Sequence, residues 1–504
     1  MITLLMWPLG IKFSFTEKVY SVRIVLIAFI FSVAVSVFLA FKLGFLVLVL
    51  LLVLVLVSQG ILKGNYKVWI TGLILLGFFG GNLIGGRTFN QFKIQNYLLK
   101  SLTNKQTTIQ GKVVTLESAQ KGIFVTLRLG AVNNKIWPYP RTNICFYTND
   151  SNKLNLGSTL KIKGNFTTGE RVSLQCLGYL TNPSLLEIEL GPQHSFSNLL
   201  MRFRQSLHKT LSHNIREPFL SLAQGYILGD DKTTDSEIKD ILERTSMTHI
   251  VAVSGFNIAI LFLLLKRIFL FFHFSPHFAY GLSLIFNIIF ITIAGSPASA
   301  IRAGIMLSLI LGAERLERMG NFLNVLLLTA FVMILVNPLI VIYDMGFQLS
   351  FLASLGLLCK QIIKPKVETI SVDRLGNVKS AVSETFWDSV LVILLVSPIL
   401  IWNGGILSLK PLLANLPVLP LVPLATFLVI TLLFISPLIP SLAYLLGFFV
   451  ETIIRLQLMV LKFVASLNFL SFRLPVISFT WIVFYYLLLV YFIHLQLRKN
   501  GNII

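Results

Sequence analysis

The chain has 504 residues, of which 55% are hydrophobic and only 12% are charged, and its formal net charge is +21. This composition excludes an ordinary soluble globular protein. Repeated apolar runs of about 20 residues instead predict a polytopic α-helical membrane protein with about 10 to 12 transmembrane helices. The positive charge is only weak support for a nucleic-acid partner, because Lys and Arg also concentrate in the cytoplasmic loops of membrane proteins.

Residues 1–88 form the first predicted domain, which consists of transmembrane helices. Apolar runs predict three helices, at about 22–40, 43–62 and 69–84. Basic residues precede the first run and separate the second from the third. The positive-inside rule therefore places the N-terminus in the cytoplasm and the chain after residue 88 outside the cell membrane.

Residues 89–196 form a polar second domain, which we expect to be extracytoplasmic and inserted after the third helix. Runs rich in β-forming residues, separated by Gly, Asn, Asp and Pro, predict five strands at 108–116, 123–129, 142–147, 159–164 and 171–180. Five short strands suit a small β-barrel, and the OB-like type is the leading candidate.

This second domain has a strong excess of Lys and Arg over Asp and Glu. Long domains translocate regardless of their charge, so the excess indicates either a simply solvated surface or a face that binds a polyanion. The candidate DNA-binding surface consists of Lys112, Lys121, Arg128, Lys135, Arg141, Lys161, Lys163 and Arg171. Cys145 and Cys176 could form a disulfide in an oxidising compartment, although their spacing does not show that the side chains meet.

Residues 197–248 are predicted to form amphipathic or interfacial helices. Within 197–212, the apolar residues Phe203, Leu207 and Leu211 form one stripe, and Arg and Lys residues surround it. This pattern is typical of a helix that lies in the membrane interface.

Residues 249–497 form the predicted main transmembrane domain. Its apolar segments predict helices at about 250–271, 280–294, 298–313, 322–341, 345–362, 386–403, 412–436, 441–465 and 477–496. Residues 364–388 are predicted to be a polar cytoplasmic loop, and the prolines between 411 and 440 predict a bent or broken region. Basic residues after the last helix place the C-terminus in the cytoplasm.

Motifs for enzymatic chemistry are not found in the sequence. It has no Walker loop, HExxH motif or paired Cys-x-x-Cys, and the residues around Ser254 do not complete a G-x-S-x-G elbow. The Thr234–Glu237 segment has the pattern of a capping box before a helix, which explains part of an acidic cluster at Asp230, Asp231, Asp235 and Asp240. We therefore expect no catalytic activity, no cofactor and no metal.

Several polar residues interrupt the apolar segments of the main transmembrane domain. Either Arg302 and Asp344 extend to a nearby interface, or they line a hydrophilic path with helix N-termini turned toward an anion. The candidate path residues are His249, Ser254, Gly255, Asn257, Ser296, Arg302, Asp344, Gln348 and Ser350.

Three segments, in this order, resemble the ComEC family of competence proteins, which are DNA-internalisation channels. They are residues 249–257 (HIVAVSGFN), 295–303 (GSPASAIRA) and 344–353 (DMGFQLSFLA), and the last follows an Asn-Pro pair at 337–338. Leu228-Gly229-Asp230 also fits the family. The resemblance covers the competence domain, roughly residues 220–470, whereas the N-terminal helices and the barrel are similar to the family in layout.

The resemblance implies a channel that takes up single-stranded DNA across the cytoplasmic membrane during natural transformation. It implies several partners: single-stranded DNA, the lipid bilayer, a DNA receptor and cytoplasmic motor proteins. It also implies a separate nuclease, because we expect no metallo-β-lactamase-like domain in this chain. Many relatives carry His at the position of Asn257, so we expect no proton or metal chemistry there. A transporter or flippase of another anion, a structural assembly component, and a homo-oligomer stay open as alternatives.

Overall fold

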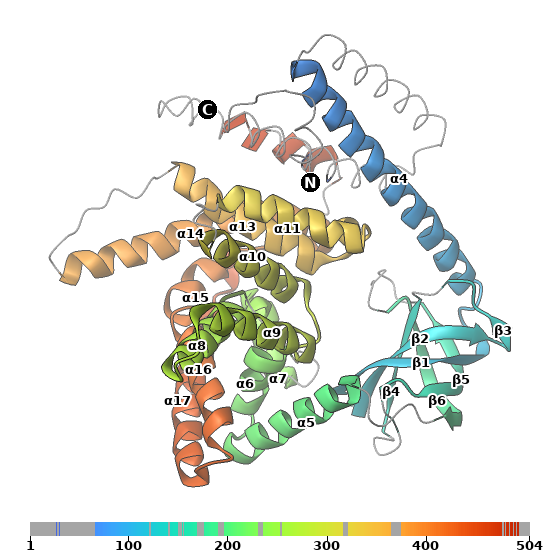
Figure 1. Cartoon of the computed structure of the whole chain (residues 1–504), viewed down its shortest axis with the longest axis horizontal. Coiled ribbons are helices and arrows are strands. Elements are labelled where there is room, and N and C mark those ends of the chain that lie inside the picture. Colours follow the sequence, from blue (N-terminus) through green and yellow to red (C-terminus); the bar gives the residue numbers. More distant parts are fainter. Residues whose placement is uncertain are drawn as a thin grey trace.

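The computed structural model contains a long helix, a β-barrel and a large assembly of helices (Figure 1). The residues that the structure describes are 27, 30, 66–119, 122–139, 142–149, 154, 156–168, 176–189, 196–229, 235–251, 255–315, 321–363, 374–475, 478, 480–482, 484–486, 488–489 and 491–492. The helices predicted at 22–40 and 43–62 lie outside them apart from two positions. The expected placement of the barrel after a third helix therefore stays a prediction.

Helix α4 (Tyr66–Lys100) is a continuous helix of 35 residues that leads into the barrel (Figure 1). The sequence predicted its end near residue 84, which was too early. Phe92 and Leu99, beyond the apolar run, are buried against the barrel, and this burial favours continuing the helix. The ring of Phe92 also lies 4.8 Å from that of Tyr343, so α4 contacts the helical assembly as well.

The predicted small barrel is confirmed as a closed five-stranded barrel. Its strands, with one short addition, are β1 (Gln106–Ala119), β2 (Gly122–Val132), β3 (Lys135–Ile136), β4 (Asn143–Thr148), β5 (Thr159–Thr167) and β6 (Gly178–Glu189). The order around the barrel is β1-β5-β6-β4-β2, and β2 pairs with β1 to close it. β4 and β6 run parallel, while the other pairs of barrel strands are antiparallel.

The two faces of the barrel wall follow the alternation of its strands. Val125, Leu127 and Leu129 of β2 point inward and meet Ile144 and Phe146 of β4 in the barrel core. The residues between them therefore point outward. This alternation decides which charged and aromatic side chains share the outer surface.

The last barrel strand begins later than the sequence predicted. The prediction was 171–180, whereas β6 starts at Gly178 and continues to Glu189; residues 171–175 lie outside the described part. Asn182 and Pro183 indicated a turn, but they lie inside the strand near a register shift, and Asn182 has a φ of 51°. A β-bulge accommodates both residue types without ending the strand.

The segment after the barrel forms α5 (Phe196–Asn214), α6 (Phe219–Leu228) and α7 (Ser236–Thr245). The amphipathic stripe of α5 is divided: Leu207 and Leu211 pack into the helical core, whereas Phe203 is exposed. The predicted helix start before Ile238 is confirmed, but the N-cap of α7 is Asp235, whose carboxylate accepts a hydrogen bond from the backbone N–H of Glu237 at 3.3 Å. Thr234, which would be the N-cap of the predicted capping box, lies outside the described residues.

The helical assembly contains α8 (Gly255–Phe271), α9 (Pro276–Ile293), α10 (Ala298–Arg315), α11 (Phe322–Val336), α12 (Ile340–Tyr343), α13 (Met345–Ile363), α14 (Arg374–Gly404), α15 (Lys410–Val418), α16 (Leu421–Ile435) and α17 (Pro440–Ser466). Further helical positions lie between 480 and 492, within the last predicted helix. The expected helix at 322–341 breaks at Pro338, which removes a backbone donor. The expected helix at 412–436 divides into α15 and α16, bent by 47°, as the prolines predicted.

The predicted polar loop at 364–388 is partly wrong. Residues 364–373 lie outside the described part, but α14 already begins at Arg374 and continues into the apolar segment. A helix nucleated by a long apolar segment extends into flanking polar residues at little cost, because each added residue gains a backbone hydrogen bond. The sequence pattern detected only the apolar part of α14.

Three described helices are long and apolar enough to cross a membrane: Pro276–Ile293, Ser383–Gly404 and Pro440–Ser466. The bent pair of α15 and α16 raises this number to four if the two helices form one span. Within the described residues this is fewer than the sequence predicted, because α11 and the apolar parts of α10 and α13 are shorter than a typical span. Buried residues of α6, α7, α16 and α17 form the main hydrophobic core.

Candidate functional site

The three sequence segments that carry the resemblance meet around Arg302 on α10. Gly255 is the first residue of α8 and packs directly against α10: a Cβ placed on it would lie 3.0 Å from Ala303 Cβ and 4.0 Å from Arg302 Nη2. On the other side, the N-terminal turn of α13 lies beside the start of α10, because a Cβ on Gly346 would be 3.8 Å from Ala298 Cβ. Glycine permits the close packing at Gly255, whereas the 3.8 Å at Gly346 is an ordinary van der Waals contact.

The guanidinium of Arg302 has partners from its own helix and from α13. Its Nη1 donates a hydrogen bond to Ser354 Oγ and contacts Met306 Sδ at 3.8 Å, and the group lies 5.9 Å from the ring centroid of Phe351. Its Nε is buried and has no hydrogen-bond partner among the described residues. Among the residues that the structure describes, no carboxylate forms an ion pair with Arg302.

Polar side chains of α13 extend the site. The carboxylate of Asp344 caps this helix by accepting a hydrogen bond from the N–H of Phe347 at 2.9 Å. Gln348 Nε2 donates to the carbonyl oxygens of Val341 and Ile342, at 2.9 and 2.8 Å. Gln348 Oε1 and the hydroxyl of Ser350 are buried, and within the described part of the chain they have no hydrogen-bond partner. Unsatisfied buried polar atoms are costly, so they suggest a site that becomes complete when a polar ligand binds.

Asn257 faces a different part of the assembly. It is 1% exposed, and its Nδ2 donates to the carbonyl oxygen of Tyr226 at 2.9 Å, while its Oδ1 accepts from Thr426 Oγ1 at 3.4 Å. The hydroxyl of Tyr226 in turn donates to Gln457 Oε1 at 2.8 Å. Asn257 therefore joins α8 to α6 and α16 and is not part of the Arg302 cluster.

The other predicted path residues are scattered. His249 lies exposed in a short 3-10 helix (Thr248–Ile250), and Ser254 lies outside the described residues. Ser296 is exposed in the turn between α9 and α10, with a φ of 55°. The structure therefore brings Gly255, Arg302 and the α13 residues together and leaves Ser296 exposed in its turn. The imidazole of His249 is accessible but has protein around it, and this desolvation lowers its pKa.

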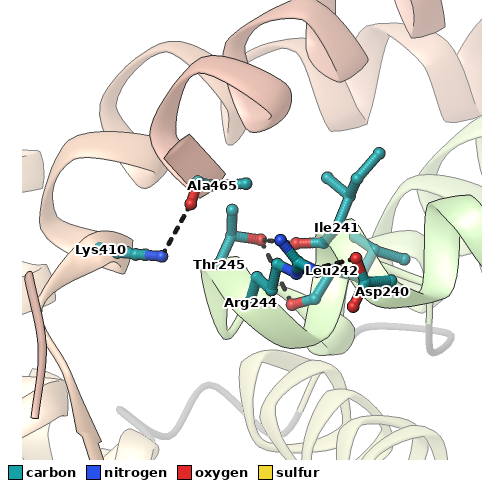
Figure 2. Close-up of polar contacts among 7 residues, drawn as sticks. All are labelled: Asp240, Ile241, Leu242, Arg244, Thr245, Lys410 and Ala465. Atoms are coloured by element: carbon teal, nitrogen blue, oxygen red, sulfur yellow. Dashed lines mark hydrogen bonds and ion pairs between the residues drawn. The ribbon is translucent and has the colours of Figure 1, made fainter. Parts of the chain in front are cut away.

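Lys410 is a second buried cation, with a different environment (Figure 2). Its Nζ donates a hydrogen bond of 3.0 Å to the carbonyl oxygen of Ala465, in the last turn of α17. The carbonyl end of a helix carries partial negative charge, which stabilises a cation. Nearby, Arg244 pairs with Asp240 at 2.8 Å. The fold itself provides the partner for Lys410.

The predicted DNA-binding surface forms a cationic stripe, Lys112, Arg128, Lys161 and Lys163, on the outer wall of the barrel. Lys112 of β1 and Arg128 of β2 are direct cross-strand neighbours, and Lys161 and Lys163 follow on the adjacent strand β5. Lys161 forms an ion pair of 3.5 Å with Glu187. Lys135 is exposed on β3, beside this stripe, whereas Lys121, Arg141 and Arg171 lie outside the described residues.

The disulfide partners and the acidic cluster were the remaining candidates. Cys145 and Cys176 are joined by a disulfide, with their Cα atoms 5.7 Å apart. Asp235 caps α7, whereas Asp230 and Asp231 lie outside the described part. Within the described residues, no group of three or more His, Cys, Asp or Glu side chains is placed to hold a metal ion.

Sequence reasoning missed Ser354, Phe351 and Lys410. Ser354 follows Ser350 by one helical turn, and its hydroxyl donates to the Ser350 carbonyl at 2.9 Å. This spacing of two serines in an apolar helix was a usable signal for one polar face. The contact between Phe351 and Arg302 depends on how α10 and α13 pack, which the sequence alone does not give.

The described residues form several apolar helices of membrane-spanning length, a closed β-barrel and a cationic cluster around Arg302, which is the architecture expected of a helical membrane protein. Residues 226–499, more than half of the chain, match the family described as "Competence protein", and the chain belongs to this family. It is also similar to the ComE operon protein 3 of Bacillus subtilis (strain 168), with 26% identity over 148 residues. That match covers 29% of this chain and 19% of the relative, and no solved structure matches the chain.

Proposed function

We propose that this protein conducts single-stranded DNA across the cytoplasmic membrane during natural transformation. The observation that carries the proposal is Arg302, a largely buried guanidinium in the helical assembly with no carboxylate partner among the described residues. A buried cation next to the first residue of a helix is well placed to meet a phosphate. The competence family of the chain supports DNA uptake as the process.

The barrel would capture the polyanion before it reaches the helices. Lys112 and Arg128 stand side by side on its outer wall, and Lys161 and Lys163 extend the stripe. We assign the barrel to the OB-like type, in which the outer surface of a five-stranded barrel binds oligonucleotides. Contacts of this kind bind the phosphates and do not depend on the base sequence.

The disulfide and the charge of the chain support the orientation that we propose. Disulfides persist in oxidising compartments, so the bond between Cys145 and Cys176 supports a barrel outside the cytoplasm. Both termini would then lie in the cytoplasm, as the positive-inside rule predicts. In this proposal the chain moves DNA without cutting it, and a receptor, a motor and a separate nuclease act with it.

Deletion and complementation in a transformable host test the proposal. Loss of the protein should abolish the internalisation of labelled DNA, whereas DNA should still bind to the cell surface. Purified protein in liposomes should in addition admit labelled single strands. Normal internalisation after deletion contradicts the proposal.

Binding of oligonucleotides to the purified protein tests the role of the cationic stripe. For single strands, the logarithm of the affinity falls with the logarithm of the salt concentration by about 0.7 per phosphate contact. The variant Lys112→Ala/Arg128→Ala should reduce this slope by about 1.4, while Lys239→Ala, an exposed control on α7, should leave it unchanged. Equal slopes in all three proteins contradict phosphate contacts at the stripe.

A transporter or flippase of another anionic substrate is the second candidate. The single guanidinium of Arg302 binds an anionic group and does not by itself distinguish a polymer from a small anion. Competition distinguishes the two. A small phosphate ester should displace bound DNA from the purified protein only if the second candidate is correct.

A further inference from the structure

An aromatic pair, Phe124 and Tyr147, lies on the same outer wall of the barrel as the cationic stripe. Phe124 and Arg128 are both outward residues of β2, four positions apart, which corresponds to about 13 Å along the strand. Tyr147 is the cross-strand partner of Phe124 on β4. The cations of β1 and β2 and the aromatic pair of β2 and β4 therefore lie on one wall of the barrel, over three adjacent strands, with the buried pair Thr126 and Cys145 between them.

The two rings of the pair have different environments. Phe124 is buried in a small outer cluster with the Cys145–Cys176 disulfide and Tyr179. Tyr147 is 44% exposed, and its ring centroid lies 4.9 Å from that of Phe124 at an interplanar angle of 62°. Phe124 and the disulfide thus form a fixed support, on which Tyr147 presents an aromatic ring to the solvent.

We propose that Tyr147 stacks on an unpaired nucleobase of a strand whose phosphates lie at Lys112 and Arg128, so that this surface selects single-stranded over duplex DNA. The inference rests on the proposed DNA binding of the barrel. Base–aromatic stacking requires an exposed base face, which a single strand offers and a base-paired duplex hides in its stack. Cations alone would bind both forms, because both carry phosphates.

Position distinguishes Tyr147 from other exposed tyrosines. Tyr97 on α4 is 76% exposed, but it lies on a helix outside the barrel wall. Tyr147 lies on the strand next to Arg128, whose own cross-strand partner on β4 is Asn143. A nucleic-acid strand that meets Lys112 and Arg128 and continues for about 13 Å along β2 and β4, over the buried Thr126 and Cys145, reaches the exposed ring of Tyr147.

The test compares two single strands of equal length, oligothymidylate and an abasic oligonucleotide with the same phosphates, on the full-length protein. Tyr147→Ala should weaken oligothymidylate binding about tenfold and leave abasic binding unchanged. Tyr147→Phe should bind both like the native protein, and so should the matched control Tyr97→Ala. The variant Lys112→Ala/Arg128→Ala should weaken both ligands alike.

A second measurement uses the native protein, so it does not depend on whether a variant folds. Oligonucleotides containing 5-iododeoxyuridine form photocrosslinks to stacked aromatic rings, so peptide mapping should find the crosslink at Tyr147. If the native protein binds both oligonucleotides but Tyr147→Ala changes neither affinity and the crosslink maps elsewhere, stacking is overturned and the DNA-binding proposal stands. If the native protein binds neither oligonucleotide, both proposals are overturned.

Discussion

Arg302 and Lys410 are both cations largely withdrawn from solvent in the helical assembly, but they meet opposite ends of helices. The ammonium of Lys410, which is 3% exposed, donates to a carbonyl oxygen in the last turn of α17. The guanidinium of Arg302 lies beside Gly255, the first residue of α8. Both residues lie near the N-termini of their own helices, Arg302 on α10 and Lys410 as the first residue of α15, so the difference is in the neighbouring helix that each charged group meets. Helix C-termini attract cations and helix N-termini repel them.

This difference in the helix end that each cation meets indicates that Lys410 is structural, whereas Arg302 belongs to a candidate ligand site. Withdrawing a charge from water costs several kcal/mol, and this cost is offset only where the surroundings supply opposite charge or hydrogen bonds. For Lys410 the carbonyl end of α17 supplies them. For Arg302 the described residues supply a hydroxyl, a thioether and a ring, and they leave Nε without a partner. An anion would complete this site, so the two cations should respond differently to substitution.

Removal of the charge at Arg302 should have the largest effect on function. Arg302→Met should lower DNA internalisation at least about 100-fold, the factor that corresponds to about 3 kcal/mol for a lost charge-assisted contact. The thermal midpoint of the purified protein should stay equal or rise, because Ser354 keeps its hydrogen bond to the Ser350 carbonyl. Uptake of labelled DNA and thermal unfolding in detergent measure the two effects.

Arg267→Met, at an exposed cation on α8, is the matched control and should leave both quantities unchanged. A large loss of stability in Arg302→Met, with uptake reduced only in proportion to the folded protein, would show that Arg302 is structural.

Lys410→Met should show the opposite pattern. It removes the hydrogen bond to Ala465 and leaves a buried carbonyl oxygen without its donor, which should cost about 1.5 to 3 kcal/mol of stability. Uptake per folded molecule should stay normal. Thermal unfolding together with uptake normalised to protein level checks this, and a variant that is stable but unable to take up DNA contradicts the structural assignment.

Arg302→Lys should give a smaller functional loss than Arg302→Met. Lysine keeps the charge but not the planar fork or the packing of the guanidinium against Phe351. We expect an uptake rate about tenfold below that of the native protein, or about 1.4 kcal/mol. The initial rate of DNA internalisation at equal protein levels is the measurement, and a rate as low as that of Arg302→Met would mean that charge alone contributes little.

The sequence predicted much of this architecture because the signals were local. Apolar period and turn residues located the barrel strands and most helices, and the prolines located the bend between α15 and α16. The errors arose where tertiary packing extended an element: Phe92 and Leu99 carry α4 into the barrel core, and β6 continues through a bulge at Asn182 and Pro183. Neither the burial of Phe92 and Leu99 nor the bulge in β6 produces a recognisable pattern in the local sequence.

The candidate site was predictable in part, for the same reason. Arg302 and the polar residues of α13 were noticed because polar groups are rare in apolar helices. Asn257 was grouped with them, yet its amide bonds to Tyr226 and Thr426 on other helices. Which polar residues face one another depends on helix rotation and packing, and these were not available from spacing along the chain.

The smallest expected effect is also the most direct distinction between the two cations. At equal ionic strength, sulfate or phosphate in place of chloride should stabilise a protein that has an incomplete anion site, by about 1.4 kcal/mol when the anion is at ten times its Kd. The measurement uses the Lys112→Ala/Arg128→Ala variant, because these two barrel cations could also bind the added anion. We expect the stabilisation in this variant. It should persist when Lys410→Met is added and disappear when Arg302→Met is added. The reverse pattern would place the unfilled anion site at the carbonyl end of α17, where helix electrostatics disfavours it.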